Sequence, residues 1–215
     1  MNLETYFPIH DTKTKGELRG IYDDFAPIYS RESFMVDYLF GLKKLRSFLM
    51  QNAAGKILDV ACGTGENFTF FRAEDDITAV DLSPGMLSLA RDRATRLGLR
   101  INFLVMDAEE LEFPDGCFDV VLSALSTCTF PDPIAALQEM KRVVRKEGRI
   151  LLLEHGRSSW EFFGKYQDRS AKRHFSNAGC RWNQEPIELI KRAGLKVLSH
   201  EDKVLGVFHA IVAVP

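Results

Sequence analysis

A glycine-containing loop is the first feature of the sequence that could do chemistry. It reads D-V-A-C-G-T-G from Asp59 to Gly65 and follows a short apolar run. Glycines such as Gly63 and Gly65 let backbone N–H groups approach a ligand closely at the start of a helix. A dinucleotide-binding loop would need a third small residue at position 68, where this chain has Phe68. The loop therefore predicts a ligand site that does not hold a dinucleotide pyrophosphate.

Acidic residues stand at the ends of the next two apolar runs. Asp81 follows Gly63 by 18 positions, the spacing at which a carboxylate can accept both hydroxyls of a ribose. Asp107 ends the third run, in V-M-D-A-E-E. Because open α/β sheets bind ligands at the carboxyl ends of their strands, this carboxylate is expected near an adenine edge.

A third acidic position is followed by a histidine. Glu154 and His155 come directly after the fifth apolar run, at the same predicted edge of the sheet. His155 is the candidate general base or acceptor-orienting group, and a structural histidine bonded to its loop is the alternative. His174 is a weaker candidate. Cys128 is interpreted as a small apolar filler rather than a nucleophile.

The elements that must position these residues alternate between strand and helix. Short, β-branched apolar runs predict strands buried on both faces, and helical periodicity fills the gaps between them. The order predicts a doubly wound α/β fold with a seven-stranded, mostly parallel sheet. The expected strands are 56–60, 77–80, 101–105, 118–122, 150–153, 195–198 and 207–214, and the expected helices are 84–97, 133–145 and 184–193.

Two segments fall outside this alternation. Residues 1–52 are expected to form a helical lid, with a break around Ala26-Pro27, in front of a core of residues 53–215. Residues 156–182 form a connection far longer than the usual 2–6 residues and are expected to be a cap inserted in the core. The basic residues of this cap could equally belong to an ordinary solvated helix.

Composition limits the class of protein. The 215 residues carry a net charge of −2, which gives no general attraction to nucleic acid or anionic membranes. The first ten residues lack the pattern of a signal peptide, and no apolar stretch is long enough to span a bilayer. Cys62, Cys117, Cys128 and Cys180 form no C-x-x-C pair, so no disulfide framework, zinc knuckle or other metal site is expected. A cytoplasmic protein is predicted.

Together these motifs resemble a class I S-adenosylmethionine-dependent methyltransferase over nearly the whole chain. The matching segments are D-V-A-C-G-T-G, A-V-D-L-S-P-G-M-L, M-D-A-E-E-L, F-P-D-G-C-F-D-V-V and M-K-R-V-V-R-K-E-G-R-I-L-L-L-E. Many members of this family have glycine at the position of Ala61. The resemblance implies a Rossmann-like fold with a helical N-terminal lid and S-adenosylmethionine as the cofactor.

The resemblance also implies roles for individual residues. Asp59 would organise the cofactor loop, with capping or stapling of the loop as its alternative role. Backbone around Ala61, Gly63 and Gly65 would hold the methionine part, Asp81 the ribose, and Asp107 with Ala108 the adenine, whose ring Leu82 and Met86 would flank. Ser123 would lie near the methionine carboxylate and the transferred methyl.

The N-terminal segment narrows the resemblance. Y-D-D-F-A-P-I-Y, from Tyr22 to Tyr29, resembles the entry helix of ubiquinone/menaquinone-type methyltransferases, with Ser30 replacing a final aspartate. Both tyrosines are candidate lid residues, and ordinary core packing is their alternative role. The segment 177–183 resembles, more loosely, enzymes acting on lipid, thiol or other hydrophobic acceptors. L-S-A-L-S after the fourth strand lacks the clamp of amino-adenine enzymes, and no Pro-Cys nucleophile is present.

The predicted function is therefore methyl transfer by in-line displacement to a small, partly hydrophobic acceptor. The acceptor classes left open are a thiol, a phenol or quinone-type ring and a lipid head group. Peripheral lipid contact is compatible with this prediction, whereas nucleic-acid binding is not expected, and the protein is expected to be a monomer or homodimer. A nicotinamide-dependent reductase and a non-catalytic S-adenosylmethionine-binding module are the alternatives.

Overall fold

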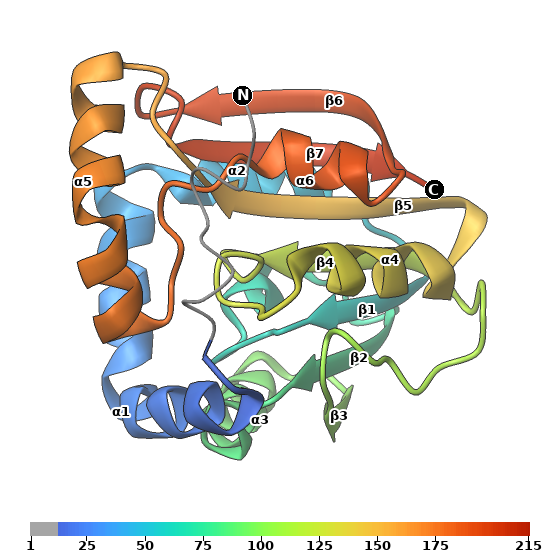
Figure 1. The fold of residues 1–215 in the computed structure, drawn as a ribbon. Coiled ribbons are helices and arrows are strands. Elements are labelled where there is room, and N and C mark those ends of the chain that lie inside the picture. The colour runs from blue at the N-terminus through green and yellow to red at the C-terminus, as the bar shows by residue number, and fades with distance from the viewer. Residues whose placement is uncertain (1–12) are drawn as a thin grey trace.

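A seven-stranded sheet forms the centre of the fold (Figure 1). The structure is a computed structural model that describes residues 13–215, apart from the side chains of 30–34 and 36. The strands are β1 (Lys56–Val60), β2 (Asp76–Asp81), β3 (Ile101–Val105), β4 (Phe118–Ala124), β5 (Val144–His155), β6 (Lys196–Lys203) and β7 (Phe208–Val214). Their order is β3-β2-β1-β4-β5-β7-β6, with only β7 antiparallel to its neighbours β5 and β6. The predicted doubly wound, mostly parallel sheet is confirmed.

Helices cover both faces of this sheet. They are α1 (Lys15–Leu39), α2 (Leu42–Met50), α3 (Pro84–Leu97), α4 (Pro133–Val143), α5 (Glu161–Ala178) and α6 (Pro186–Arg192), with a short 3₁₀ helix, η2 (Glu66–Phe70). The Ser83 hydroxyl caps α3 by accepting a hydrogen bond from the Met86 N–H, and Pro84 follows at the first helical position. Asp132 and Pro133 begin α4 in the same way. The helices predicted from these signals are confirmed, with ends that differ by a few residues.

The core consists of two apolar layers, one on each face of the sheet. Leu58 and Val121 point to the layer covered by α4 and α6, whereas Ile57 and Val120 point to the layer covered by α2 and α3. Because successive strand residues face opposite sides, a strand buried on both faces has to be apolar almost throughout. This explains why the runs in the sequence are continuous rather than alternating.

The predicted break at Ala26-Pro27 is wrong: α1 continues through Pro27. Its axis changes direction about half-way along the helix (Figure 1). An interior proline removes one backbone hydrogen bond and costs about 3 kcal/mol. Packing of α1 against α3 and α2 offsets that local cost. The predicted lid segment 1–52 is thus α1 and α2 within the described residues, and its first twelve residues lie outside them.

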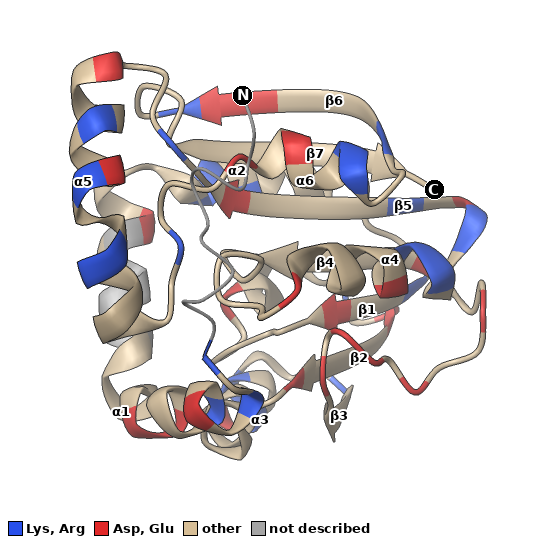
Figure 2. Ribbon diagram, in the orientation of Figure 1, with Lys and Arg blue, Asp and Glu red and all other residues tan. Residues whose placement is uncertain are grey.

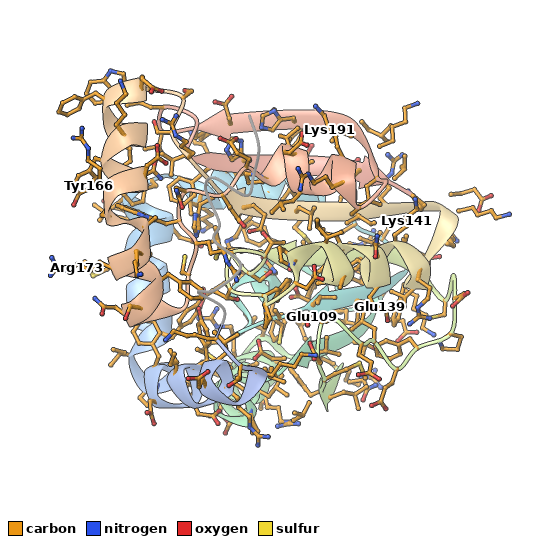
Figure 3. All side chains as sticks on the ribbon, in the orientation of Figure 1. Glu109, Glu139, Lys141, Tyr166, Arg173 and Lys191 are labelled. Carbon is orange, nitrogen blue, oxygen red and sulfur yellow. The ribbon has the colours of Figure 1, made fainter. Side chains whose placement is uncertain are left out.

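The predicted cap, residues 156–182, contains α5. The parallel strands point toward the side of the molecule where α1 and α5 stand (Figure 1). A buried glutamine, Gln167, anchors the cap because its amide accepts from the Ser158 N–H and donates to the carbonyls of Gly156 and Trp182. Basic residues are distributed along α5 (Figure 2). Tyr166 and Arg173 project from the outer side of this helix (Figure 3). None of the helices described is long and apolar enough to cross a membrane.

Candidate functional site

A pocket opens at the carboxyl edge of the sheet, between the strand ends and α1. It combines the glycine loop, the ends of β2 and β3, the loop after β4 and the first half of α1. Its lining consists of Lys15, Leu18, Arg19, Tyr22, Tyr29, Ala61, Gly63, Asp81, Leu82, Ser83, Met86, Met106, Asp107, Ala108, Ala124, Leu125, Ser126, Thr129, Phe130 and Pro131. Most of the predicted site residues therefore come together in one place.

The glycine loop makes its turn with three left-handed residues. Ala61, Gly63 and Gly65 have φ values of 51°, 57° and 82°. Ala61 thus adopts a conformation that suits glycine, the residue that the family resemblance leads one to expect at this position, and the turn is still made. A Cβ on Gly65 would lie 2.4 Å from the Phe68 ring, so the bulky Phe68 packs directly beneath the loop. Gly65 supports the turn but does not line the pocket.

Asp81 ties the loop to the end of β2. Its Oδ2 accepts a hydrogen bond from the Gly63 N–H at 2.8 Å, and its Oδ1 accepts one from the Ser83 N–H at 2.9 Å. Burial raises the pKa of this carboxyl to about 6, although the backbone donors oppose the shift. A carboxylate has about four acceptor positions, more than these backbone donors occupy, so Asp81 can also accept from a ligand in the pocket.

The end of β3 is charged and partly occupied by the lid. Asp107 forms an ion pair with Lys15 of α1, and Lys15 also contacts Glu109 at 3.3 Å. The hydrogen bond to Asp107 raises the pKa of Lys15. The pocket wall also has an apolar part, which is formed by Leu82, Met86 and Ala108. The place predicted for an adenine ring is therefore lined by both charged and apolar side chains.

Two predicted site residues lie behind the wall rather than in it. Asp59 is fully buried and accepts both of its hydrogen bonds from the Asn67 amide. Asn67 in turn accepts from Arg46 at 2.6 Å, so Asp59 joins a buried network beneath the loop. Ser123 is also fully buried, with its hydroxyl donating to the Val60 carbonyl and contacting the Ser126 hydroxyl. Ser126 lines the pocket instead.

A residue that sequence analysis did not single out joins α1 to the start of α3. Asp23 accepts hydrogen bonds from the Ser83 hydroxyl and from the Gly85 N–H, both at the start of α3. Burial alone would raise the pKa of Asp23, but these donors lower it below its ordinary value. Tyr22 and Tyr29, on either side of this contact, reach the pocket. The only sequence signal for Asp23 was its place directly after Tyr22 in the entry-helix motif.

His155 does not line this pocket. Its Nε2 lies 3.3 Å from the Cys180 Sγ, just after α5. Burial alone would lower the pKa of His155, but its contacts with Cys180 and Glu154 raise it. Cys128, the thiol interpreted as a filler, interacts with Cys180 and lowers the pKa of that thiol well below its ordinary value. His174 stacks on Trp182, with ring centres 4.8 Å apart.

Comparisons with known proteins assign this architecture to a family. Residues 58–152 match the model of a family described as "Methyltransferase domain". The ubiquinone/menaquinone biosynthesis C-methyltransferase UbiE of Burkholderia mallei is 31% identical, over 77% of this chain and 72% of that protein. The chain belongs to the class I S-adenosylmethionine-dependent methyltransferases. S-adenosylmethionine is the cofactor of this family.

Other methyltransferases extend the similarity over most of the chain. The mitochondrial methyltransferase OMS1 of Saccharomyces cerevisiae is 28% identical over 98% of this chain, which spans only 47% of that protein. This chain likewise spans 64% of the demethylmenaquinone methyltransferase of Thermus thermophilus. A solved methyltransferase of Thermotoga maritima, described as a possible histamine N-methyltransferase, has the same fold, with a TM-score of 0.67 at 24% identity over 91% of this chain and 98% of its own.

The geometry of the pocket fits the cofactor of the family. Residues of the glycine loop, the buried carboxylate of Asp81 and an apolar wall all line one space. A Cβ on Gly63 would lie 3.6 Å from the Tyr29 ring. The gap between the loop and the lid is therefore narrow, so a larger residue than glycine would reduce the space for a ligand there.

Proposed function

We propose that this methyltransferase transfers the methyl group of S-adenosylmethionine to a small, partly hydrophobic acceptor by in-line displacement. The observation that carries the proposal is the pocket that joins the glycine loop, Asp81 and the tyrosines of α1. The cofactor would supply a methyl group activated by a sulfonium. The chain would supply alignment and the exclusion of water, which contribute most to such a displacement.

On the cofactor side, the residues that line the pocket keep their predicted tasks. The backbone of Ala61 and Gly63 would hold the methionine part, with Gly65 supporting the turn behind them, and Asp81 would accept the ribose hydroxyls. Asp107 and Ala108 would meet the adenine edge between Leu82 and Met86. Asp59 and Ser123 would act from behind the wall, by keeping the loop and the end of β4 in place. Lys15 holds Asp107 through an ion pair, so cofactor binding would compete with this lid contact.

On the acceptor side, the lid and the loop after β4 would form an apolar chamber. Tyr22, Tyr29, Leu125 and Phe130 supply its surfaces. Burial raises the pKa of both tyrosines, so they stay neutral and act as walls and hydrogen-bond donors. His155 lies outside the pocket lining, beside Cys180, and is proposed as the group that takes a proton from an acceptor that reaches past the chamber. A phenol or an activated carbon needs such a base, whereas a thiol needs only stabilisation of its thiolate.

The relatives support the class of acceptor. Several carry names of quinone-modifying methyltransferases, and one is a phosphatidylethanolamine N-methyltransferase from Cereibacter sphaeroides, 35% identical over 47% of this chain and 51% of that protein. We infer a partly hydrophobic acceptor for this chain from these names and from its apolar chamber. The absence of nucleic-acid binding, the cytoplasmic location and the monomeric or dimeric state remain predictions.

Calorimetry followed by an acceptor panel tests the proposal. We expect micromolar binding of S-adenosylmethionine and of its demethylated product, and no binding of a nicotinamide dinucleotide. The panel should contain an alkyl thiol, a quinol and a phospholipid head group, each assayed for a methylated product by mass spectrometry. Cofactor binding without turnover on any acceptor would favour the non-catalytic module, and binding of the dinucleotide would favour the reductase.

A further inference from the structure

Three soft donor atoms from distant parts of the chain meet beside the lid. They are the Sγ atoms of Cys128 and Cys180 and a ring nitrogen of His155, and all lie within 4.8 Å of one another. Cys128 belongs to the loop after β4, His155 ends β5 and Cys180 follows α5. Cys128 is buried and the other two are half-buried. No other group of potential ligands of this kind is found among residues 13–215.

Hydrogen bonds hold the three donor-bearing segments together. The Arg181 N–H donates to the Cys128 carbonyl at 2.9 Å, which fixes the two cysteine segments side by side. The Gln184 amide donates to the His155 carbonyl at 3.2 Å and to the Thr127 hydroxyl at 2.9 Å. Gln184 thereby joins all three segments. Hydrogen bonds outside the cluster therefore hold the three donor atoms near one another.

The donor set suits a thiophilic divalent cation. In a tetrahedral zinc site, Zn–S and Zn–N bonds of about 2.3 and 2.0 Å place neighbouring donors roughly 3.5–3.8 Å apart. The His155 Nε2 and the Cys180 Sγ, at 3.3 Å, are already close to that separation.

We propose that Cys128, His155 and Cys180 form a Cys₂His site for a thiophilic divalent cation of the zinc type. Bound there, the ion would join the loop after β4, the end of β5 and the cap at one point. Three protein ligands leave one coordination position for water or for a polar group of a ligand, as in open zinc sites.

The site extends the proposed function and constrains one part of it. A ring nitrogen that binds a metal ion cannot accept a proton at the same time. In the metal-loaded protein, His155 would thus be a ligand and not a base. Cofactor binding depends on the other end of the sheet edge, at Asp81, so the metal site and the methyltransferase function can fail independently.

Metal content and titration with Zn²⁺ alone test the proposal. The reduced full chain, freed of metal by a chelator, is expected to bind one equivalent of Zn²⁺ in competition with a chromophoric chelator. Titration with Co²⁺ is expected to give thiolate-to-metal charge-transfer absorption. Cys128→Ser and Cys180→Ser should each weaken Zn²⁺ binding by more than the 10- to 100-fold that loss of an outer contact costs. His155→Asn should weaken it as well.

The controls separate loss of a ligand from loss of the fold. Cys117→Ser, at a half-buried thiol outside the cluster, should leave Zn²⁺ affinity unchanged. S-adenosylmethionine affinity measured on every variant reports whether the protein is folded. Absence of stoichiometric Zn²⁺ binding by the reduced protein would overturn the site, and so would equal affinity in the Cys128, Cys180 and Cys117 variants. The proposed site would also be overturned if Cys128 and Cys180 formed a disulfide and the protein bound no Zn²⁺ after that disulfide was reduced.

Discussion

The two halves of the sheet's carboxyl edge hold their buried carboxylates in different ways. At the end of β2, Asp81 accepts hydrogen bonds from the backbone N–H groups of Gly63 in the glycine loop and of Ser83 just after β2. At the end of β5, one Glu154 oxygen accepts from the Thr127 N–H at 3.3 Å, and the other has no hydrogen-bond partner among the residues described. Burial raises the pKa of Asp81 to about 6 and that of Glu154 to about 7.

This difference indicates a division of labour. Backbone donors are present whatever the side chains are, so the β1–β3 half is suited to a ligand that all members of the family share. Around Glu154 and His155, by contrast, only one contact comes from a backbone N–H, that of Thr127, and the others come from the side chains of Cys180 and Gln184 in the segment after α5. The half formed by β4, β5 and α5 can therefore vary with the acceptor.

The largest effect is expected on the acceptor half, from His155→Ala. If His155 takes the acceptor proton, the variant should lower kcat by about 10²- to 10⁴-fold and leave cofactor affinity unchanged. His200→Ala, at an exposed histidine of β6, is the matched control. Steady-state kinetics and calorimetry on the same preparations make the comparison. If His155→Ala lost activity and cofactor affinity equally, the two halves of the sheet edge would not have separate tasks. Zn²⁺ content, measured on the same preparations, would show whether His155 acts as a base or as a metal ligand.

The next largest effect is expected on the cofactor half, from Asp81→Ala. Loss of the charge-assisted hydrogen bonds to the ribose should cost roughly 2–4 kcal/mol, or about 30- to 700-fold in cofactor affinity. The control is Asp76→Ala, an exposed carboxylate at the other end of the same strand. Isothermal titration calorimetry measures both. An Asp81 variant that binds the cofactor as tightly as the wild type would refute the ribose assignment.

A smaller effect is expected where the lid joins the two halves. Asp23→Ala removes the contacts with Ser83 and Gly85 and should lower kcat/KM roughly 10- to 100-fold, because hydrogen bonds to charged groups contribute about 1.5–3 kcal/mol. Far-ultraviolet circular dichroism should show an intact fold, since the strands do not depend on this contact. The exposed neighbour Asp24 gives the control variant Asp24→Ala.

Gly85→Ala tests the same contact without removing the carboxylate. A Cβ there would lie 3.0 Å from the Asp23 Oδ1 and 3.3 Å from its Cα. The added methyl group should displace the lid and lower kcat/KM as Asp23→Ala does, but by a smaller factor. Full activity in both variants would show that closure of the lid does not depend on Asp23.

The smallest effect concerns Asp59, beneath the cofactor loop. Burial raises its pKa to about 7, although the Asn67 hydrogen bond and Arg46 oppose the shift. A carboxyl pKa higher in the folded than in the unfolded chain means that the folded protein binds more protons between pH 4 and 7. Stability should therefore fall as the pH rises through this window. Asp59→Asn should reduce that fall by several degrees in Tm, since 1 kcal/mol corresponds to about 2–4 °C in a chain of this size.

Thermal unfolding of wild type and Asp59→Asn at pH 5 and pH 8 checks this expectation. The matched control is Asp76→Asn, whose carboxylate is exposed and should leave the pH dependence as it is. An identical pH dependence in wild type and Asp59→Asn would show that Asp59 does not carry the predicted proton.

The sequence by itself determined the order in which the motifs and their strands follow along the chain, and most residues of the cofactor site in the β1–β3 half of the sheet edge. Apolar runs and capping residues act over a few positions, so β1 to β5 and the starts of α3 and α4 could be located directly. Gly63 and Asp81 were both predicted for the ligand site; they lie side by side because both stand at the carboxyl ends of adjacent parallel strands, and 2.8 Å separates the Gly63 N atom from the Asp81 Oδ2. Local spacing is sufficient where a loop and its strand form the site.

Tertiary structure alone decided the rest. Pro27 predicted a break that packing of α1 prevented, and Asp23 acquired its role only when α1 met the start of α3. The side chains of Ser123 and Asp59 are fully buried, whereas Ser126 lines the pocket. Cys128 and Cys180 show no pairing pattern in the sequence, yet their Sγ atoms lie within 4.8 Å of each other and of His155. Contacts of this kind depend on how crossovers return the chain to one edge of the sheet, and no local pattern encodes that return.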